Sequence, residues 1–157
     1  MLLVCGAPLA QPGGGRRASV AASTPHVSTV DTRMRITVLI ADDNREVRDF
    51  LAFFLGREAD LEVVGQAADG AEALSLIQTL KPDVVLMDVE MPNVNGVEAT
   101  LQAASLPCPP QIIGMSVLDH ADTMQAAGAC AFMYKDGLFR NAKRLIRRHA
   151  RRVDRRE

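Results

Sequence analysis

The chain has 157 residues, of which 48% are hydrophobic and 24% are charged, which fits one globular domain with tails. No apolar run approaches the roughly 20 residues that a membrane span requires. The cysteines, Cys5, Cys108 and Cys130, are odd in number and widely spaced, which argues against a disulfide framework and a zinc site. We therefore expect a protein of the reducing cytoplasm.

The formal net charge of −1 conceals an uneven distribution of charge along the chain. Residues 36–139 contain 5 basic and 16 acidic residues, whereas residues 140–157 contain 9 basic and 2 acidic residues. An acidic body followed by a basic end needs an explanation that the totals do not supply.

Residues 1–35 are rich in Gly, Pro, Ser, Thr and Ala and show neither a helical nor a strand period. We expect a disordered extension here. The Gly13-Gly14-Gly15 run lacks the Gly-Lys-Ser/Thr that completes a phosphate-binding loop. Met34 stands directly before the first predicted strand and is an alternative start of the protein, in which case the preceding segment is mis-assigned.

From Ile36 onward, short apolar runs alternate with segments of helical spacing. Asp42-Asp43-Asn44 can cap the first helix, and Asp69 with Glu72 resembles a capping box for the second. Pro82 ends the second helix, and Gly128 ends the fourth. The predicted strands cover residues 36–41, 61–67, 83–88, 111–115 and 129–134. The predicted helices cover residues 47–55, 72–80, 97–104, 121–127 and 138–153.

Five alternations of strand and helix predict an α/β fold with a parallel sheet and helices on both faces. The unbroken apolar runs suit strands that are buried on both faces. In open sheets of this kind, ligands bind outside the carboxyl ends of the strands, at the point where the strand order reverses.

The informative polar residues all fall at those strand ends. Asp42 and Asp43 follow the first strand, Asp88 ends the third, Ser116 the fourth and Lys135 the fifth. If the strand order is 2-1-3-4-5, the three carboxylates converge in one crevice, where their mutual repulsion favours a hard cation such as Mg²⁺. An ammonium and a hydroxyl on the same rim suit a phosphoryl group, and a carboxylate can be its nucleophilic acceptor.

Four segments around these residues resemble the receiver domains of bacterial two-component response regulators, over about residues 36–148. The resemblance implies a doubly wound, flavodoxin-like sheet of five strands with order 2-1-3-4-5. The segments are Ile-Thr-Val-Leu-Ile-Ala-Asp-Asp-Asn at 36–44, Lys-Pro-Asp-Val-Val-Leu-Met-Asp-Val-Glu-Met-Pro-Asn-Val-Asn-Gly at 81–96, Ile-Ile-Gly-Met-Ser at 112–116 and Ala-Phe-Met-Tyr-Lys-Asp at 131–136.

The resemblance also implies a role for each site residue. Asp88 would accept a phosphoryl group from the phosphohistidine of a kinase. Mg²⁺ would be held by Asp43, by Asp88 and by the backbone carbonyl of Glu90, with Asp42 assisting through water. Ser116 and Lys135 would contact the phosphoryl oxygens. Phe132 would be the aromatic residue that swings inward when Ser116 moves.

Simpler interpretations of the same residues stay open. Asp42 and Asp43 could only cap a helix, Ser116 could only end a strand, Lys135 could be an ordinary surface lysine and Phe132 a core residue. The basic stretch at 140–156 could be a solvated helix face or a binding surface.

The sequence departs from the family pattern in the spacing of its motifs. The segment between Ser116 and Lys135 is short by about one helical turn, and the segment between Asp88 and Ser116 is slightly short. The helices after the third and fourth strands are therefore affected. Since the second of these shapes the usual output surface, the partner and the dimer mode stay open.

We expect a stand-alone receiver at residues 36–148, with a basic tail at 149–157 that extends the last helix. Its partner would be a sensor histidine kinase or a phosphotransfer protein, and homodimer formation stays open. We expect neither sequence-specific DNA binding nor a membrane contact. The domain would be no enzyme in the usual sense, because it would catalyse only its own phosphoryl transfer and a slow autodephosphorylation. The alternatives are a fragment of a larger regulator and a degenerate receiver that binds proteins without phosphorylation.

Overall fold

The computed structural model describes residues 35–150, in which five parallel strands form one sheet with order β2-β1-β3-β4-β5. The predicted fold class and strand order are therefore confirmed. A 3₁₀ turn at Lys135–Gly137 links β5 to the last helix. In chain order the elements are β1 (Ile36–Ala41), α1 (Arg45–Gly56), β2 (Leu61–Ala67), α2 (Gly70–Leu80), β3 (Val84–Asp88), α3 (Gly96–Ala104), β4 (Gln111–Ser116), α4 (Ala121–Ala127), β5 (Ala131–Tyr134) and α5 (Leu138–His149).

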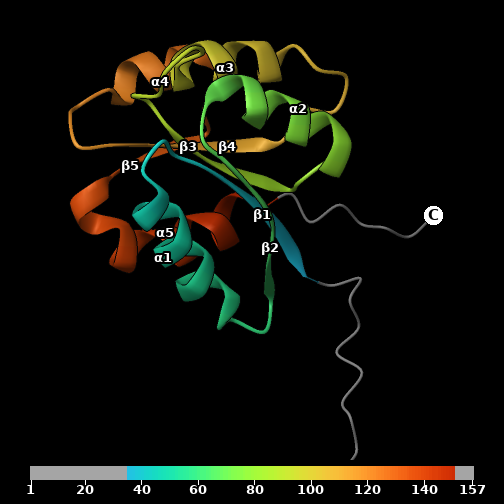
Figure 1. Cartoon of the computed structure of the whole chain (residues 1–157), viewed down its shortest axis with the longest axis vertical. Coiled ribbons are helices and arrows are strands. Elements are labelled where there is room, and N and C mark those ends of the chain that lie inside the picture. The colour runs from blue at the N-terminus through green and yellow to red at the C-terminus, as the bar shows by residue number, and fades with distance from the viewer. Residues whose placement is uncertain (1–34, 151–157) are drawn as a thin grey trace, which may run out of the picture. The chain divides into compact units, whose positions relative to one another are not determined.

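Two apolar layers cover the two faces of the sheet. Helices α1 and α5 lie on one side and α2, α3 and α4 on the other (Figure 1). Successive strand residues alternate between the layers, so Val38 packs with Leu51 and Ile146 on the α1–α5 side, whereas Leu39 packs with Ile77 on the other. In the central strand β3, all four residues before Asp88 are apolar and buried, so the first polar side chain of this strand lies at its carboxyl end.

The helix caps follow the predicted signals. The side chain of Asn44 accepts a hydrogen bond from Glu46 N at 2.9 Å and begins α1. Asp69 caps α2 through Glu72 N at 2.8 Å, and the Glu72 carboxylate in turn accepts from Ala68 N at 2.8 Å. Gly128 ends α4 with φ of +116°, a conformation that glycine adopts without steric cost. These caps fix where each helix begins or ends, and so fix the loops between them.

Two glycines allow helices to approach other backbone segments more closely than any side chain would permit. A Cβ at Gly96, the first residue of α3, would lie 1.9 Å from the backbone oxygen of Asp88. A Cβ at Gly70, the first residue of α2, would lie 2.3 Å from the backbone oxygen of Val94. The Gly70 N–H donates to that same oxygen at 2.9 Å. The loop from β3 to α3 therefore contacts the first residue of α3 at one end and the first residue of α2 at the other.

The basic helix α5 is tied to the acidic turn between α1 and β2. Lys143 Nζ lies 2.5 Å from Glu58 Oε1, and Arg147 bonds Glu58 at 2.7 Å and Asp60 at 2.8 Å. Hydrogen bonds from Lys143 and Arg147 lower the pKa of the Glu58 carboxyl, and the bond from Arg147 lowers the pKa of Asp60. Part of the basic end therefore finds its acidic partner within the same domain.

Helix α5 ends at His149, with Ala150 at a non-helical ψ of 119°. The expectation that Ala150 continues the helix is therefore wrong. Arg144 and Arg148 lie one turn apart, and like charges at this spacing disfavour further helical turns. Val153 and the rest of the basic tail lie outside the described residues.

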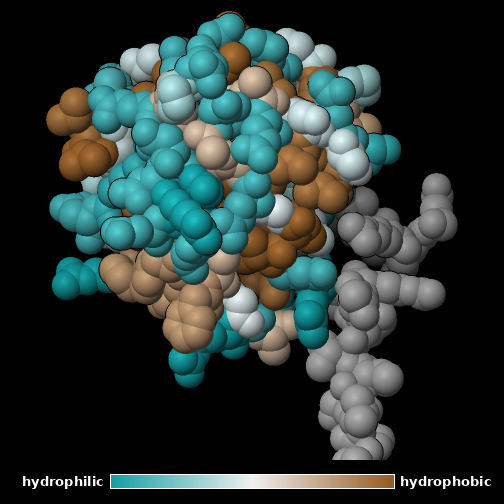
Figure 2. All heavy atoms as spheres, in the orientation of Figure 1, coloured by the Kyte–Doolittle hydropathy of each residue, from teal (hydrophilic) through white to brown (hydrophobic). Residues whose placement is uncertain are grey.

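Four of the five phenylalanines of the chain gather on the α1–α5 side, and Figure 2 shows hydrophobic side chains over α1. The rings of Phe50, Phe54 and Phe139 lie within 5.8 Å of one another, and Lys143 Nζ lies 3.8 Å from the Phe54 ring centre. Phe53 is 65% exposed and Phe139 58% exposed.

Among the described residues, no helix is long and apolar enough to cross a membrane.

The close approach at Gly96 generates the first prediction. Gly96→Ala forces a methyl group against the Asp88 carbonyl, so we expect the free energy of unfolding to fall by about 1–3 kcal/mol. Gly56→Ala is the control, because nothing lies within 4 Å of a Cβ at Gly56. We expect it to be neutral or to stabilise by up to about 1 kcal/mol. Urea denaturation measures both, and equal stability of the two variants would contradict the proposed steric limit.

Candidate functional site

The site begins with two carboxylates at the ends of neighbouring strands. Ala41 of β1 is level with Met87 of β3 in the parallel register, so the residues that follow them, Asp42 and Asp88, lie side by side. Their exposed fractions are 0% and 2%. Two hydrogen bonds hold Asp42 in place. Its backbone N–H donates to Ala67 O at 3.1 Å, and its side-chain Oδ1 accepts from Asn44 N at 2.9 Å.

Lys135, which follows β5, brings its ammonium between these two carboxylates. Its Nζ lies 2.8 Å from Asp42 Oδ2 and 3.1 Å from Asp88 Oδ2. Burial alone would lower the pKa of Lys135, but hydrogen bonds and charges from Asp42, and then from Asp88, outweigh it and raise the pKa. The ammonium therefore stays charged, and the interpretation of Lys135 as an ordinary surface lysine is wrong.

Asp43 completes a group of three carboxylates with Asp42 and Asp88. One oxygen from each lies within 4.8 Å of the others, and Asp43 is exposed whereas the other two are buried. Apart from the Lys135 ammonium, the buried Asp42 Oδ2 atom has no hydrogen-bond donor among the described residues. An oxygen-only donor set with an incompletely satisfied buried atom is the kind of site that suits a hard divalent cation.

The burial of Asp88 changes its titration. Loss of hydration and then the neighbouring charge of Asp42 raise its pKa from the usual 3.8 to about 6. The Lys135 charge and the Glu90 N–H act in the opposite direction but do not cancel the effect. One of the two buried carboxyls is thus only weakly acidic unless a further positive charge joins them.

Ser116 and Phe132 lie on the neighbouring strands β4 and β5. The buried Ser116 hydroxyl accepts a hydrogen bond from Leu118 N at 3.0 Å, and among the described residues it bonds no carboxylate of the site. Phe132 is half-buried and packs edge-to-face on Tyr134 with ring centres 5.5 Å apart. It lies across Gly114, because a Cβ there would come 2.9 Å from the Phe132 ring. Since Gly114 lies two residues before Ser116, Ser116 lies on the face of β4 that Phe132 covers.

The sequence analysis missed one residue beside the site. Arg48, in the first turns of α1, donates from Nη1 to the backbone oxygen of Asp42 at 2.7 Å and to that of Asp43 at 3.3 Å. Backbone acceptors leave no mark in a sequence, so only its position one turn into a helix behind two aspartates could have suggested it.

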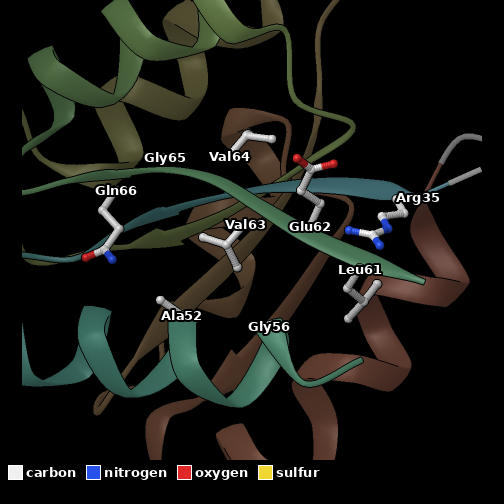
Figure 3. Close-up of a pocket in the computed structure, with 9 residues that line it drawn as sticks. All are labelled: Arg35, Ala52, Gly56, Leu61, Glu62, Val63, Val64, Gly65 and Gln66. Carbon is white, nitrogen blue, oxygen red and sulfur yellow. The ribbon is translucent and has the colours of Figure 1, made fainter. Parts of the chain in front are cut away.

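A separate hollow follows the free edge of β2. It is lined by residues of β2 together with Ala52 and Gly56 of α1 and Arg35 (Figure 3). In that view the side chains of Arg35 and Glu62 lie at the same end of the hollow. Its lining includes none of the predicted site residues, so it is distinct from the carboxylate group.

Comparison with known proteins agrees with this arrangement. The pattern that defines the response regulator receiver domain matches residues 38–145. The uncharacterized transcriptional regulatory protein YhcZ of Bacillus subtilis is 43% identical over 102 residues, which cover 63% of this chain and 48% of that protein. Protein-glutamate methylesterase/protein-glutamine glutaminase 3 of Anaeromyxobacter dehalogenans is 40% identical over 121 residues, covering 71% of this chain and 35% of that protein.

Solved structures agree as well. The response regulator domain of Thermotoga maritima CheB superposes with a TM-score of 0.69 at 32% identity, covering 74% of this chain and 96% of that one. The receiver domain of the putative response regulator NarL from Mycobacterium tuberculosis gives a TM-score of 0.66 at 28% identity, covering 72% and 97%. The chain spans between about a third and a half of the length of the two curated relatives described above. The chain therefore belongs to the response regulator receiver domain family of two-component signalling.

Proposed function

We propose that Asp88 accepts a phosphoryl group from a protein phosphohistidine and that the phosphorylated domain signals by a change of shape. The observation that carries the proposal is the buried Asp88 carboxylate, held 3.1 Å from an ammonium and beside two further carboxylates. In the transfer, an oxygen of Asp88 forms a bond to phosphorus as the phosphorus–nitrogen bond of the phosphohistidine breaks.

We propose that Asp42, Asp43, Asp88 and the backbone carbonyl of Glu90 hold Mg²⁺. The three carboxylates and the single Lys135 ammonium leave a formal charge of −2, which one divalent ion balances. The ion would supply positive charge to the phosphoryl oxygens and keep Asp88 ionised as a nucleophile. Asp42, whose Oδ2 already lies 2.8 Å from the Lys135 ammonium, would assist the ion through water.

Lys135 and Ser116 would hold the phosphoryl oxygens. The Lys135 ammonium already lies against Asp88, so it needs only a small movement to reach an added phosphoryl group. The Ser116 oxygen accepts the Leu118 N–H, which leaves its own proton free to donate. Ser116 can therefore bond a phosphoryl oxygen without giving up an existing donor.

Phe132 would transmit the change. It lies over Gly114 on the strand that ends at Ser116, so a shift of Ser116 toward the phosphoryl group alters the space beside the Phe132 ring. We propose that this ring turns inward, together with its edge-to-face neighbour Tyr134, which is half-exposed. The exposed surface at β5 thus changes with phosphorylation.

We propose a sensor histidine kinase or a phosphotransfer protein as the phosphoryl donor, and the cytoplasm as the place where the domain acts. We propose that the domain acts as a self-contained switch at residues 36–148, with residues 1–35 and 149–157 outside it. The role in transcription that the name of YhcZ gives belongs to that protein, and we do not propose sequence-specific DNA binding for this chain. The rival function is an interaction module without phosphorylation. It does not explain why Lys135 is held between the buried carboxylates of Asp42 and Asp88.

The first test of the proposal is direct phosphorylation. With a small acyl phosphate and Mg²⁺, we expect one added phosphoryl group in the intact mass and its loss in Asp88→Asn. Asp122→Asn, which removes an exposed carboxylate on α4, is the control and should be modified like the wild type. Equal modification of Asp88→Asn would place the acceptor elsewhere and favour the rival function.

Magnesium alone should stabilise the fold, because three carboxylates repel one another when no cation joins them. At about 100 times its dissociation constant, binding to the native state adds about 2.7 kcal/mol to the free energy of unfolding. Thermal denaturation with and without Mg²⁺ measures the gain. We expect it to be lost in Asp43→Ala and kept in Asp122→Ala, and an equal gain in both variants would rule out this cluster.

The pKa of Asp88 predicts how stability depends on pH without divalent cations. Because the folded-state pKa of about 6 exceeds the usual 3.8, the native state binds this proton more tightly than the unfolded chain. The resulting stabilisation is complete below pH about 4 and is lost as the pH rises through 6, at most about 3 kcal/mol.

Asp88→Asn isolates this contribution because an amide does not titrate. We expect the variant to exceed the wild type in free energy of unfolding at pH 7 by more than it does at pH 5. Urea denaturation at both pH values gives the two differences, and equal differences would show that Asp88 titrates normally.

A further inference from the structure

We infer that Arg48 is a positioning residue, which holds the loop between β1 and α1 so that Asp42 and Asp43 are set for the cation. The inference rests on the proposed function and extends it to a residue outside the carboxylate cluster. Arg48 is half-buried, and its Nη1 reaches the backbone oxygens of Asp42 and Asp43 at 2.7 and 3.3 Å. One cationic donor thus contacts both residues that follow β1.

These two carbonyls lie between the end of β1 and the first hydrogen bond of α1, where no backbone N–H of the helix reaches them. Helix α1 begins at Arg45, and the backbone N–H of Arg48 bonds Asn44 O at 3.1 Å, so the Asp42 and Asp43 carbonyls come before that helical bond. The Arg48 side chain supplies a donor in their place. A hydrogen bond with a charged donor is worth about twice a neutral one, which suits an anchor for a short loop.

The other side of the loop is already fixed. Asp42 N donates to Ala67 O at 3.1 Å, and Asp42 Oδ1 accepts from Asn44 N. These bonds hold Asp42, whereas within residues 35–150 the exposed Asp43 has no hydrogen bond other than the one from Arg48. The contact from Arg48 to the Asp43 carbonyl is therefore the bond that restrains this ligand, as partners behind metal ligands do in metal sites.

A rival explanation is that Arg48 acts only through its charge. Positive charge near the cluster would repel Mg²⁺, so its removal would tighten cation binding. Positioning predicts the opposite sign, because the contacts are to backbone oxygens and their loss frees the loop. The two explanations can therefore be separated by the direction in which affinity moves.

The experiment measures the Mg²⁺ dissociation constant of the full chain by calorimetry, together with the melting temperature. We expect Arg48→Met to weaken Mg²⁺ binding roughly tenfold. Arg48→Lys keeps the charge and a donor but not the planar fork, so it should bind more weakly than wild type and more tightly than Arg48→Met. The matched control is Arg45→Met, since the Arg45 side chain is 83% exposed on the same helix and, among the described residues, its ion pair is with Asp49 at 3.4 Å. It should bind Mg²⁺ as the wild type does.

Each outcome decides between the explanations. Equal or tighter Mg²⁺ binding by Arg48→Met overturns the inference, and so does a lower melting temperature with an unchanged dissociation constant, which marks a purely structural role. If Arg48→Met does not fold, an Arg48→Lys affinity equal to or tighter than that of wild type overturns it. Failure of the wild type itself to bind Mg²⁺ would instead overturn the proposed function.

Discussion

The ion pair of Lys135 with Asp42 and Asp88 is the interaction on which the rest of the site depends. Two buried carboxylates side by side repel each other strongly, and the ammonium between them is what allows both to remain there. Lys135 follows β5, which is separated from β3 by β4, so the ion pair joins strand ends that are not neighbours in the sheet. Such a buried arrangement is a poor source of stability, because the loss of hydration can exceed the attraction. Its presence agrees better with the phosphoryl transfer proposed for Asp88 than with a role in folding.

The surrounding fold serves to keep these groups in place. The β3–α3 loop that follows Asp88 is restrained at both ends. Gly96 N donates to Val89 O at 2.9 Å, and the start of α3 at Gly96 lies in close contact with the Asp88 carbonyl. On its other side the loop bonds α2 through Gly70, next to the end of β2. The sheet places the strand ends level, and the glycines bring the helices close enough to fix the loops. Rigid loops matter here because the raised pKa of Asp88 depends on its burial first and on the charge of Asp42 second, and a moving loop would change both.

The sequence predicts the site well where the information is local and poorly where it depends on distant partners. Apolar runs that end in Asp42, Asp88, Ser116 and Lys135 locate the strand ends, and the alternation of strand and helix brings them to one edge. Arg48 could not be assigned in this way, because its acceptors are backbone oxygens that every sequence contains. The choice of Glu58 and Asp60 as partners of α5 likewise depends on how the α1–β2 turn faces a helix almost 90 residues later. The roles proposed for Ser116 and Phe132 depend on movement, for which the position of a residue in a strand carries no signal.

The charge asymmetry of the chain is resolved only in part by these contacts. Lys143 and Arg147 face the acidic turn, whereas Arg140, Arg144 and Arg148 form an exposed row on another face of α5. Exposed ion pairs contribute little to stability, so the burial of Leu138, Ala142 and Ile146 must provide most of the energy that holds α5 on the sheet. The ion pairs favour the same rotation of the helix, since turning it would separate Lys143 and Arg147 from the acidic turn. The apolar stripe therefore holds α5 on the sheet, and the acidic turn determines which basic residues form ion pairs and which face solvent.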